Sequence, residues 1–225
     1  MPTILALETS TEFCSVALHV DGKIITNEVT AGQRHSEMLL PMIHELLAEA
    51  ELTLQQLDGI AFGAGPGSFT GLRIACGVTQ GLAYAANLPV IAITTLEAVA
   101  EKIAQNNVIV ALDARMGEIY YAAYQKTADS NWKVIHAPSL CLPQHAPPVL
   151  DHGWHGGGSG FDTFHEILST RYHGALQQIH GGLHPHAEQI AMLALEKYRA
   201  NTTIHATQAV PVYIRNKVAL KENER

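Results

Sequence analysis

The chain has 225 residues, 47% of them hydrophobic, which suffices for one large domain or two small ones with a sizeable core. Its 14 lysines and arginines against 21 aspartates and glutamates give a formal net charge of −7, which argues against this chain alone binding a nucleic-acid backbone. Its 3 cysteines are too few and too widely spaced for a disulfide framework or a zinc site, and they indicate a reducing compartment. No stretch approaches the roughly 20 apolar residues of a membrane span and the first residues lack a signal-peptide pattern, so we expect a soluble cytoplasmic protein.

The first thirty residues predict a small sheet with a polar turn near its start. Three apolar or alternating runs have the pattern of strands, at residues 3–7, 14–20 and 23–30. Between the first two lies an acidic and hydroxyl-rich turn that contains Glu8, Thr9 and Ser10. This order resembles the opening of the actin-like ATPase fold, in which the turn faces nucleotide phosphates. The three residues are therefore weak candidates for nucleotide contact, and an ordinary antiparallel hairpin sheet is the alternative interpretation.

Residues 36–49 predict a helix whose apolar face is unusually wide. Its apolar side chains spread over roughly 200° of the helical wheel, about twice the width of an ordinary core stripe. One side of this arc can pack on the predicted sheet and leave the other side uncovered, which indicates a partner surface; coverage by a second domain is the alternative. The residues assigned to the partner surface on this helix are Met38, Leu39, Met42, Ile43 and Leu46.

A glycine-rich turn joins a predicted strand that ends near residue 62 to a predicted helix at 70–86. No lysine followed by serine or threonine comes after the glycines, so the turn is not a P-loop. Residue 68 is a serine, so the third glycine of a dinucleotide-binding fingerprint is also missing. We interpret the segment as a structural turn between strand and helix, made by Gly63, Gly65, Pro66 and Gly67.

The helix at 70–86 has an ordinary core face and an unusual opposite face. The core face is predicted to comprise Gly71, Ile74, Ala75, Val78, Leu82 and Ala85. The opposite face carries one arginine as its only charge and two glycines four positions apart, each of which costs about 1 kcal/mol relative to alanine. Such a face indicates close contact with a partner or a ligand, and burial on both sides within its own domain is the alternative. Its residues are Arg73, Cys76, Gly77, Gln80, Gly81 and Tyr84.

The second half of the chain repeats the strand–turn–strand opening of the first half. Further strands are predicted at residues 90–94, 108–112 and 119–124, and further helices at 96–104, at 162–170 and within 184–199. The repeat surrounds a charged turn at 113–118 and indicates two related lobes. We place these lobes at residues 1–104 and 105–207, with 208–225 packing back on the first lobe.

The histidines and carboxylates form no pattern that predicts catalysis. Of the 13 histidines, 8 lie in the Pro- and Gly-rich region 145–186 without an HExxH motif or paired cysteines, and we expect them at the surface. The glycine run at 156–160 fits a phosphate-binding loop or an ordinary loop. Glu8, Asp113 and Glu118 stand at strand ends, where a carboxylate serves acid–base catalysis or simply caps a turn. The chain also has no nucleophile elbow, so we predict no catalytic residue and no metal site.

Four segments carry a resemblance to a known family. They are LALETSTEFCSVAL at 5–18, GAGPGSFTGLR at 63–73, DARMGEIYYAAY at 113–124 and PVYIR at 211–215. Together they resemble the TsaB (YeaZ) family of the actin-like ATPase superfamily, a group once described as glycoproteases. The resemblance implies an α/β fold of two actin-like (ASKHA, RNase H-like) lobes, each a mixed sheet flanked by helices.

The resemblance also implies a function in the synthesis of N6-threonylcarbamoyladenosine at position 37 of tRNAs that read codons starting with A. Members are expected to act there as non-catalytic scaffolds that pair with the transferase TsaD and recruit the ATPase TsaE. They are expected to meet tRNA only through the complex and to form homodimers through a similar surface when alone. A metal-dependent protease or an ATPase in its own right is the alternative.

Two departures follow from the same resemblance, one from the catalytic paralogue and one from the usual sequence of the family. The His-x-x-x-His metal motif of that paralogue aligns with Thr95 and Val99, neither of which is a competent zinc or iron ligand. The first phosphate turn carries Glu8 where the family usually has aspartate, and the extra methylene displaces the carboxylate. The resemblance therefore implies no metal centre and no cofactor.

Overall fold

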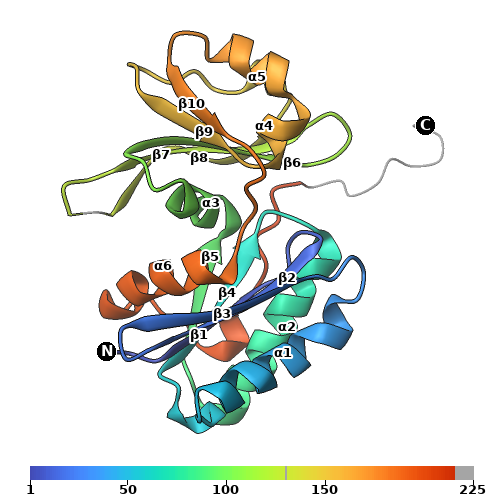
Figure 1. Cartoon of the computed structure of the whole chain (residues 1–225), viewed down its shortest axis with the longest axis vertical. Coiled ribbons are helices and arrows are strands. Elements are labelled where there is room, and N and C mark those ends of the chain that lie inside the picture. Colours follow the sequence, from blue (N-terminus) through green and yellow to red (C-terminus); the bar gives the residue numbers. More distant parts are fainter. Residues whose placement is uncertain (130, 216–225) are drawn as a thin grey trace.

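The structure, a computed structural model, describes residues 1–129 and 131–215, which form two α/β lobes stacked along the long axis of the molecule (Figure 1). Each lobe contains a five-stranded sheet. The first sheet has the order β3-β2-β1-β4-β5, with β1 (Ile4–Glu8), β2 (Phe13–Val20), β3 (Lys23–Thr30), β4 (Gly59–Gly65) and β5 (Val90–Thr94). The second has the order β10-β9-β6-β7-β8, with β6 (Asn107–Asp113), β7 (Ile119–Lys126), β8 (Trp132–Cys141), β9 (Trp154–Gly157) and β10 (Leu176–His180).

The two sheets are built by the same series of pairings. In the first sheet β1, β2 and β3 form an antiparallel meander, and β4 and β5 extend the sheet from β1 in parallel. In the second sheet β6, β7 and β8 form the meander, and β9 and β10 extend the sheet from β6 in parallel. The predicted α/β fold of two mixed sheets is confirmed, and the turns after β1 and β6 hold equivalent positions.

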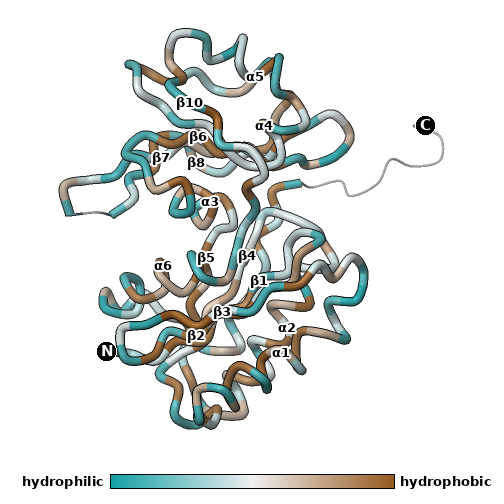
Figure 2. The backbone as a smooth tube through the Cα atoms, viewed as in Figure 1, coloured by the Kyte–Doolittle hydropathy of each residue, from teal (hydrophilic) through white to brown (hydrophobic). Residues whose placement is uncertain are grey.

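Helices cover both faces of the first sheet. They are α1 (His35–Glu49) and α2 (Phe69–Ala86) on one face and α6 (Ala187–Arg199) on the other. Successive side chains of a strand point to opposite faces, so Leu5 and Leu7 of β1 pack in the cluster with α1 and α2. Ile4 and Ala6 of the same strand pack in the cluster with α6. Hydrophobic positions are correspondingly dense along these strands (Figure 2).

The second sheet is also covered on both faces. The remaining helices are α3 (Thr95–Ile103), α4 (Ser159–Thr163) and α5 (His165–Arg171), with short 3-10 turns η1 (Leu54–Gln56), η2 (Pro143–His145) and η3 (Ala206–Gln208). Val108 and Val110 of β6 pack against α3, whereas Ile109 and Ala111 face the cluster that contains α4 and α5. Among the helices of the described residues, none combines the length and hydrophobicity required to cross a membrane.

Helices α3 and α6 each pack on a sheet other than the one assigned to them by the predicted division at residues 104 and 105. α3 covers the second sheet, and α6 covers the first. The described part of the C-terminal segment, up to residue 215, contacts α2 through Ala209 and Tyr213, and residues 216–225 lie outside the described residues. We therefore propose lobes made of 1–94 with 187–215, and of 95–186.

The glycine run at 156–160 belongs to the core of the second lobe, which corrects its interpretation as a loop. Gly156 and Gly157 lie in β9, and a Cβ on Gly156 would stand 2.6 Å from the ring of Phe161. A Cβ on Gly160 would stand 2.9 Å from the backbone of Ala111. These glycines let α4 pack closely on β6 and β9, so their role is packing.

Candidate functional site

An open cleft of about 820 Å³ lies where the turns after equivalent strands of the two sheets face one another. The turns after β1, β4 and β6 line it, together with α4 and the segment before α1. Its hydroxyl-bearing residues are Ser10, Thr11, Ser68, Thr70, Tyr120, Ser159 and Thr163. Asp113 and Arg115 add charge from the second lobe. The volume is within the range of small-molecule sites, which is about 300 to 1,000 Å³.

Glu8 lies beneath the cleft and does not line it. Its side chain is buried, and Oε1 accepts a hydrogen bond from the backbone N–H of Ser10. Within the described part of the chain, Oε2 has no hydrogen-bond partner. Burial raises the pKa of this carboxyl group to about 7, against lowering contributions from Ser10 and Thr9. A Cβ on Gly63 would collide with Oε2, so the glycine at 63 provides the space for this carboxyl group.

Thr9 and Ser10 tie the turn after β1 to the beginning of α2. Thr9 Oγ1 donates a hydrogen bond of 2.7 Å to the carbonyl oxygen of Gly71. The N–H of Ser68 donates to the carbonyl oxygen of Ser10 at 2.8 Å. Of the three residues predicted to contact a nucleotide, Ser10 borders the cleft, while Glu8 and Thr9 do not. Nucleotide contact by these residues stays a prediction.

The glycine-rich turn after β4 is fixed by contacts from both sides. The carbonyl oxygen of Pro66 accepts a hydrogen bond from Thr95 Oγ1 of α3. A Cβ on Gly67 would stand 2.6 Å from Ser10 Cβ, so this position accepts little more than a hydrogen. Pro66 and Gly67 both line the cleft. The turn thus links the strand, the helix and the second-lobe helix α3.

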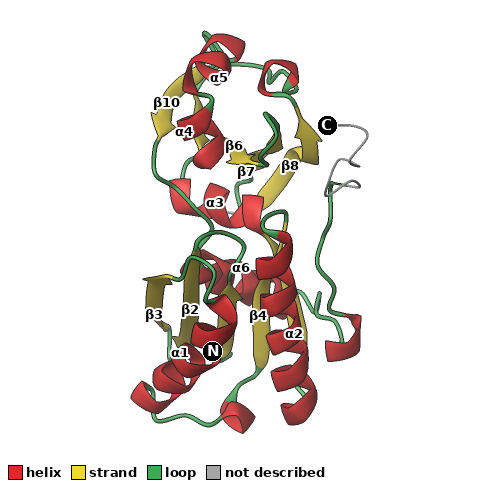
Figure 3. Cartoon of the chain, turned by 90° about the vertical axis from the view of Figure 1, so that its right-hand side faces the viewer, coloured by secondary structure: helices red, strands yellow, loops and turns green. Residues whose placement is uncertain are grey.

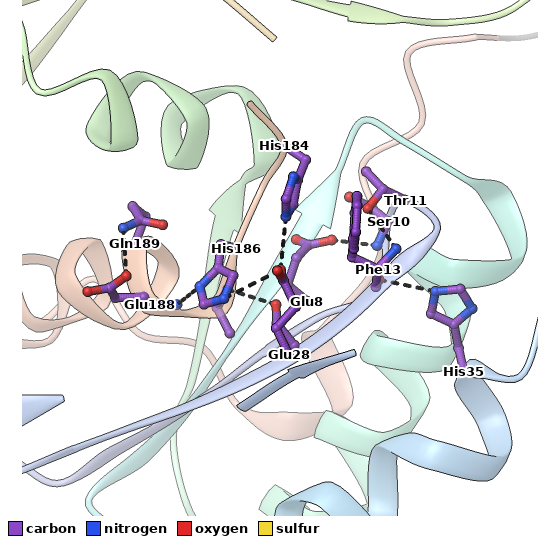
Figure 4. Close-up of polar contacts among 12 residues, drawn as sticks. Glu8, Ser10, Thr11, Phe13, Glu28, His35, His184, His186, Glu188 and Gln189 are labelled. Carbon is purple, nitrogen blue, oxygen red and sulfur yellow. Dashed lines mark hydrogen bonds and ion pairs between the residues drawn. The ribbon is translucent and has the colours of Figure 1, made fainter. Parts of the chain in front are cut away.

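A carboxylate and two histidines join the edge of the first sheet to the beginning of α6 (Figure 4). His184 Nε2 lies 2.9 Å from Glu28 Oε2 of β3, and His186 Nε2 lies 3.4 Å from the same oxygen. His184 also stacks on Phe13 with ring centroids 4.0 Å apart. His186 Nδ1 accepts a hydrogen bond from the N–H of Glu188 and so caps α6. These contacts fix the segment by which the chain returns from the second sheet to the first.

The expectation that the histidines of region 145–186 lie at the surface holds for part of the set. His145, His152, His165 and His173 are exposed, whereas His155 and His186 are buried and His180 and His184 are half-buried. Nδ1 of His155 lies 3.0 Å from Nε2 of His180, so the imidazoles pair with each other. Within residues 1–129 and 131–215, no three histidine, cysteine, aspartate or glutamate side chains are arranged to hold a metal ion.

The predicted partner surface on α1 is largely a core face. Leu39, Met42, Ile43 and Leu46 are at most 4% exposed and belong to the core cluster between α1, α2 and the sheet, and Met38 is half-buried against it. The assignment of these side chains to a partner is therefore corrected, because they form the core stripe of α1. The uncovered part of the apolar arc is Leu40, which is 51% exposed, beside the half-buried Leu47.

The unusual face of α2 is divided between the chain's own C-terminal segment and solvent. Gln80 Nε2 and Cys76 Sγ both donate to the carbonyl oxygen of Ala209, and Arg73 Nε donates to the Tyr213 hydroxyl. Cys76 is buried, so for this residue the prediction of partner contact is corrected to contact within the chain. Arg73 is exposed and Gln80 half-buried, so for these two partner contact stays a prediction. Partner contact by the remaining three residues stays a prediction. A Cβ on Gly77 or Gly81 would meet no atom of the described residues within 4 Å, and Tyr84 is 70% exposed.

The buried face of α2 is rotated slightly about the helix axis from the predicted core face. The helix buries Gly71, Leu72, Ala75, Cys76, Thr79 and Ala83. Ile74, Val78 and Leu82 are half-buried on the side that faces α1, and Ala85 is exposed. This half-buried side of α2 adjoins an apolar groove of about 400 Å³ between the two helices, lined by Leu40, Ile43, His44, Leu47, Ala48, Leu52, Leu54 and Leu82. α1 and α2 lie next to each other on one side of the first lobe (Figure 3).

The chain is 36% identical to the tRNA threonylcarbamoyladenosine biosynthesis protein TsaB of Haemophilus influenzae, over 98% of this chain and 96% of that protein. The chain belongs to the TsaB family. The TsaB of Escherichia coli is 34% identical over 97% of each chain. The solved structure of YeaZ from Pseudomonas aeruginosa superposes with a TM-score of 0.87, at 37% identity over 95% of this chain and 100% of that one.

A second similarity connects this TsaB family member with the transferases. The family described as "TsaD: tRNA N6-adenosine threonylcarbamoyltransferase" matches residues 23–145. Thr95 and Val99, the two positions at which we expect no metal ligand, both have structural roles in this chain. Thr95 is buried and donates to Pro66, and Val99 lies in the core of the second lobe. In this TsaB chain both positions therefore serve packing.

Sequence reasoning missed two sets of residues around the site. Glu28 and His184 pair across 156 positions, and Arg215 pairs with Glu118 of the turn after β6. Contacts at such separation leave no mark in local periodicity. In the sequence, only the His-Pro-His spacing at 184–186 and the PVYIR motif point to these residues, and neither motif indicates which residue is contacted.

Proposed function

We propose that the chain takes part in tRNA threonylcarbamoyladenosine biosynthesis, as a cytoplasmic, non-catalytic subunit that is needed for N6-threonylcarbamoylation of adenosine 37 in tRNAs that read codons starting with A. Membership of the TsaB family supports the pathway. The observation that carries the accessory role is the apolar groove between α1 and α2, bordered by exposed Leu40. Exposed contiguous apolar surface is typical of protein interfaces.

The proposed interface is the α1–α2 face, which we define as Leu40, His44, Leu47, Gly77, Gly81 and Tyr84 with the groove between the helices. Glycines at 77 and 81 leave the backbone of α2 uncovered, so a partner helix can approach closely. Tyr84 offers the large amphipathic surface that interface centres favour. TsaD is the proposed partner on this face, and in its absence a second copy of the chain takes its place.

The charge and the lost metal positions support a division of labour within the complex. With a net charge of −7, this chain is poorly suited to holding tRNA by itself, so tRNA is bound through the complex. Thr95 and Val99 supply no metal ligand at the positions aligned with those of TsaD. Transfer chemistry therefore belongs to TsaD, and the ATPase TsaE joins the pair of subunits.

Substitution of Gly81 by tryptophan tests the interface. The fold should be retained, because the position is open and any residue other than proline raises helix propensity over glycine. We expect binding of TsaD to weaken by more than about tenfold in calorimetry, since the bulky side chain stands on the contact face. In reconstituted tRNA modification with TsaD and TsaE, product formation should fall in parallel.

The matched control is Glu166→Trp, which places the same side chain on exposed α5 of the second lobe. This variant should bind TsaD as the unmodified chain does. Normal co-purification of Gly81→Trp with TsaD would remove the α1–α2 face as the interface. Full tRNA modification in reactions that lack the chain would remove the proposed function itself.

A second candidate function is nucleotide binding or hydrolysis by the chain alone, which the cleft of about 820 Å³ favours. The buried position of Glu8 argues against it, because the carboxylate predicted to face phosphates does not reach the cleft. Calorimetry with ADP and metal analysis of the pure chain decide between the candidates. Micromolar ADP affinity or stoichiometric zinc or iron would favour the enzyme.

A further inference from the structure

The last described segment of the chain runs from the first lobe to the second beside the mouth of the cleft. We call residues 209–215 the C-terminal strap. It leaves η3 on the first lobe, follows α2 and ends at the turn after β6 in the second lobe (Figure 3). The strap belongs to no helix or strand, so its position depends on individual side-chain and backbone contacts.

Hydrogen bonds and ring packing anchor the strap on the first lobe. Gln80 holds the carbonyl oxygen of Ala209 at 2.7 Å, and the N–H of Val212 donates to Ala64 at the end of β4 at 2.7 Å. Tyr213 accepts a hydrogen bond of 2.9 Å from Arg73. The Arg73 guanidinium in turn stacks 3.8 Å above the ring of Phe69, whose centroid lies 5.2 Å from that of Tyr213.

The glycine-rich turn is shaped to receive the strap. Gly65 has a φ of +116°, which side-chain-bearing residues rarely adopt, and a Cβ there would stand 2.8 Å from the carbonyl oxygen of Val212. Both the backbone conformation and the space therefore require glycine at this position. The structural turn thus serves the strap as well as the link from β4 to α2.

A single arginine anchors the strap on the second lobe. Arg215 Nη2 donates to the carbonyl oxygen of Ala114 at 3.0 Å and forms an ion pair of 2.8 Å with Glu118 Oε2. Nη1 lies 3.2 Å from the sulfur of Met116. The side chains of Arg215 and Glu118 are 13% and 29% exposed, so the pair is shielded from solvent more than an ordinary surface pair.

The turn that receives Arg215 has an unusual backbone. Arg115 and Met116 have φ values of +62° and +57°, in the left-handed region, where each residue other than glycine costs about 1 to 2 kcal/mol. Such a conformation persists when surrounding contacts hold it. Arg215 supplies contacts of this kind, because it binds the carbonyl of Ala114 and the Glu118 side chain on either side of these two residues.

The strap is placed to control the cleft. A smaller cavity of about 230 Å³ lies under the strap, lined by Val212, Tyr213, Ile214 and Arg215 on one side. This cavity and the cleft share Pro66, Gly67, Ser68, Ala114, Arg115 and Tyr120. The same two turns therefore form the mouth of the cleft and contact the strap, at Val212 and at Arg215. Their separation sets how far the cleft opens.

We infer that the C-terminal strap is an interlobe latch: Arg215 and Glu118 form its releasable bond, and release of Arg215 from the 114–118 turn lets the lobes move apart and the cleft widen. The strap's contacts with α2 and β4 remain in place when Arg215 dissociates from the 114–118 turn. The latch acts on the relative position of the lobes, independently of the α1–α2 face.

The test compares Arg215→Met with the unmodified chain in two measurements. Spin labels on cysteines introduced at the exposed cleft positions Gln33 and Thr163 report the interlobe distance, in a background with Cys141→Ser and the buried Cys14 and Cys76 retained. We expect a broader distribution shifted to longer distances. Hydrogen exchange at the 114–118 turn should be faster by roughly tenfold, because the turn loses its anchor.

Two further variants make the outcome decisive. Arg199→Met removes an arginine whose ion pair with Glu196 lies within α6, and it should leave both measurements unchanged. Glu118→Gln should give an intermediate effect, because it keeps the carbonyl contacts of Arg215 and removes the ion pair. An unchanged distance distribution and unchanged exchange in Arg215→Met would overturn the latch, as would equal effects in Arg199→Met.

Discussion

Glu8 shows how a single buried acid acquires an unusual proton affinity. The side chain lies beneath the cleft, with one oxygen bonded to the Ser10 N–H and the other without a partner among the described residues. Burial disfavours the charged form and raises the pKa to about 7. The folded state therefore binds the proton more tightly than the unfolded state, whose carboxyl group titrates near the ordinary value of 4.5. The free energy of unfolding accordingly falls as the pH rises between these two values and is constant above them.

Glu8→Gln should remove this pH dependence while keeping the size of the side chain. Between about pH 5 and pH 8, the unfolding free energy of the unmodified chain should fall relative to that of the variant by an amount on the order of 2 to 3 kcal/mol. Urea denaturation of both proteins at the two pH values measures it. The other titrating groups are the same in the unmodified chain and the variant, so their contributions to the pH dependence cancel in the difference. Parallel pH profiles would show that Glu8 titrates normally in the fold.

At the scale of the element, α2 contains glycines of two kinds. Gly71 faces the turn after β1, and a Cβ there would collide with the carbonyl oxygen of Thr9. At Gly77, in contrast, a Cβ would have no neighbour within 4 Å in the part of the chain that the structure describes. The same residue type therefore marks close backbone packing at one position and an uncovered helix surface at another.

Substitution of each of these glycines by alanine separates the two roles. Gly77→Ala should raise the free energy of unfolding of the isolated chain by about 0.5 to 1 kcal/mol, through helix propensity alone. Gly71→Ala should lower it by about 1 to 3 kcal/mol, because the backbone must shift to admit the methyl group. Urea denaturation of the two variants measures both effects. Changes of the same sign would contradict this difference between the two sites.

Local pattern predicted the elements up to β7 and the helix α6 well, but it missed the strands after β7. The strands up to β7 and the helices up to α3 match the expected ranges within about two residues, because their apolar periodicity is strong. The exception is β4, which continues to Gly65, three residues beyond the expected end near residue 62. β8, β9 and β10 were not expected, since proline, glycine and histidine dominate that region and hide the alternation. The role of the glycines in and after β9 is evident only from their contacts with Phe161 of α4 and Ala111 of β6, which the local sequence pattern does not show.

Prediction of the candidate site failed where contacts are distant in sequence. The width of the apolar arc on α1 was visible, but its orientation toward the sheet was not, so core residues such as Leu39 and Ile43 were assigned to a partner. On α2, Cys76 and Gln80 looked unpaired because Ala209 lies more than 100 residues away. A helical wheel records which residues share a face and carries no information on what covers that face.

At the scale of the whole molecule, histidines stand at both ends of the segment that returns from β10 to α6. His180 pairs with His155 at one end, and His184 and His186 approach Glu28 at the other. Burial lowers the pKa of His180, and the neighbouring His155 lowers it further. Burial also lowers the pKa of His186 from 6.5, with Glu28 acting in the opposite direction. Both histidines have a lower pKa in the folded protein than they have when the segment opens to solvent. The opened segment therefore binds protons more tightly, and it opens more easily as the pH falls through 6.5.

His186→Asn should weaken this acid sensitivity, because asparagine caps a helix without titrating in this range. In the unmodified chain, hydrogen exchange at residues 181–187, corrected for its intrinsic pH dependence, should speed up between about pH 7 and pH 5.5. The variant should show a smaller acceleration. His173→Asn, at an exposed position, is the matched control and should behave as the unmodified chain. Equal acceleration in all three proteins would contradict the role of His186.

The packing of α6 on the first sheet has a consequence for how the protein is made. β1, β4 and β5 leave the ribosome early, but the helix that covers one of their faces is synthesised after the whole second lobe. Until then Ile4, Ile91 and Ile93 have no native cover on that side. The segment 95–186, in contrast, carries both helical layers of its own sheet and can fold as soon as it emerges. The nascent first half therefore has an exposed apolar surface from the synthesis of β5 until that of α6, and that surface is where we expect chaperones to bind.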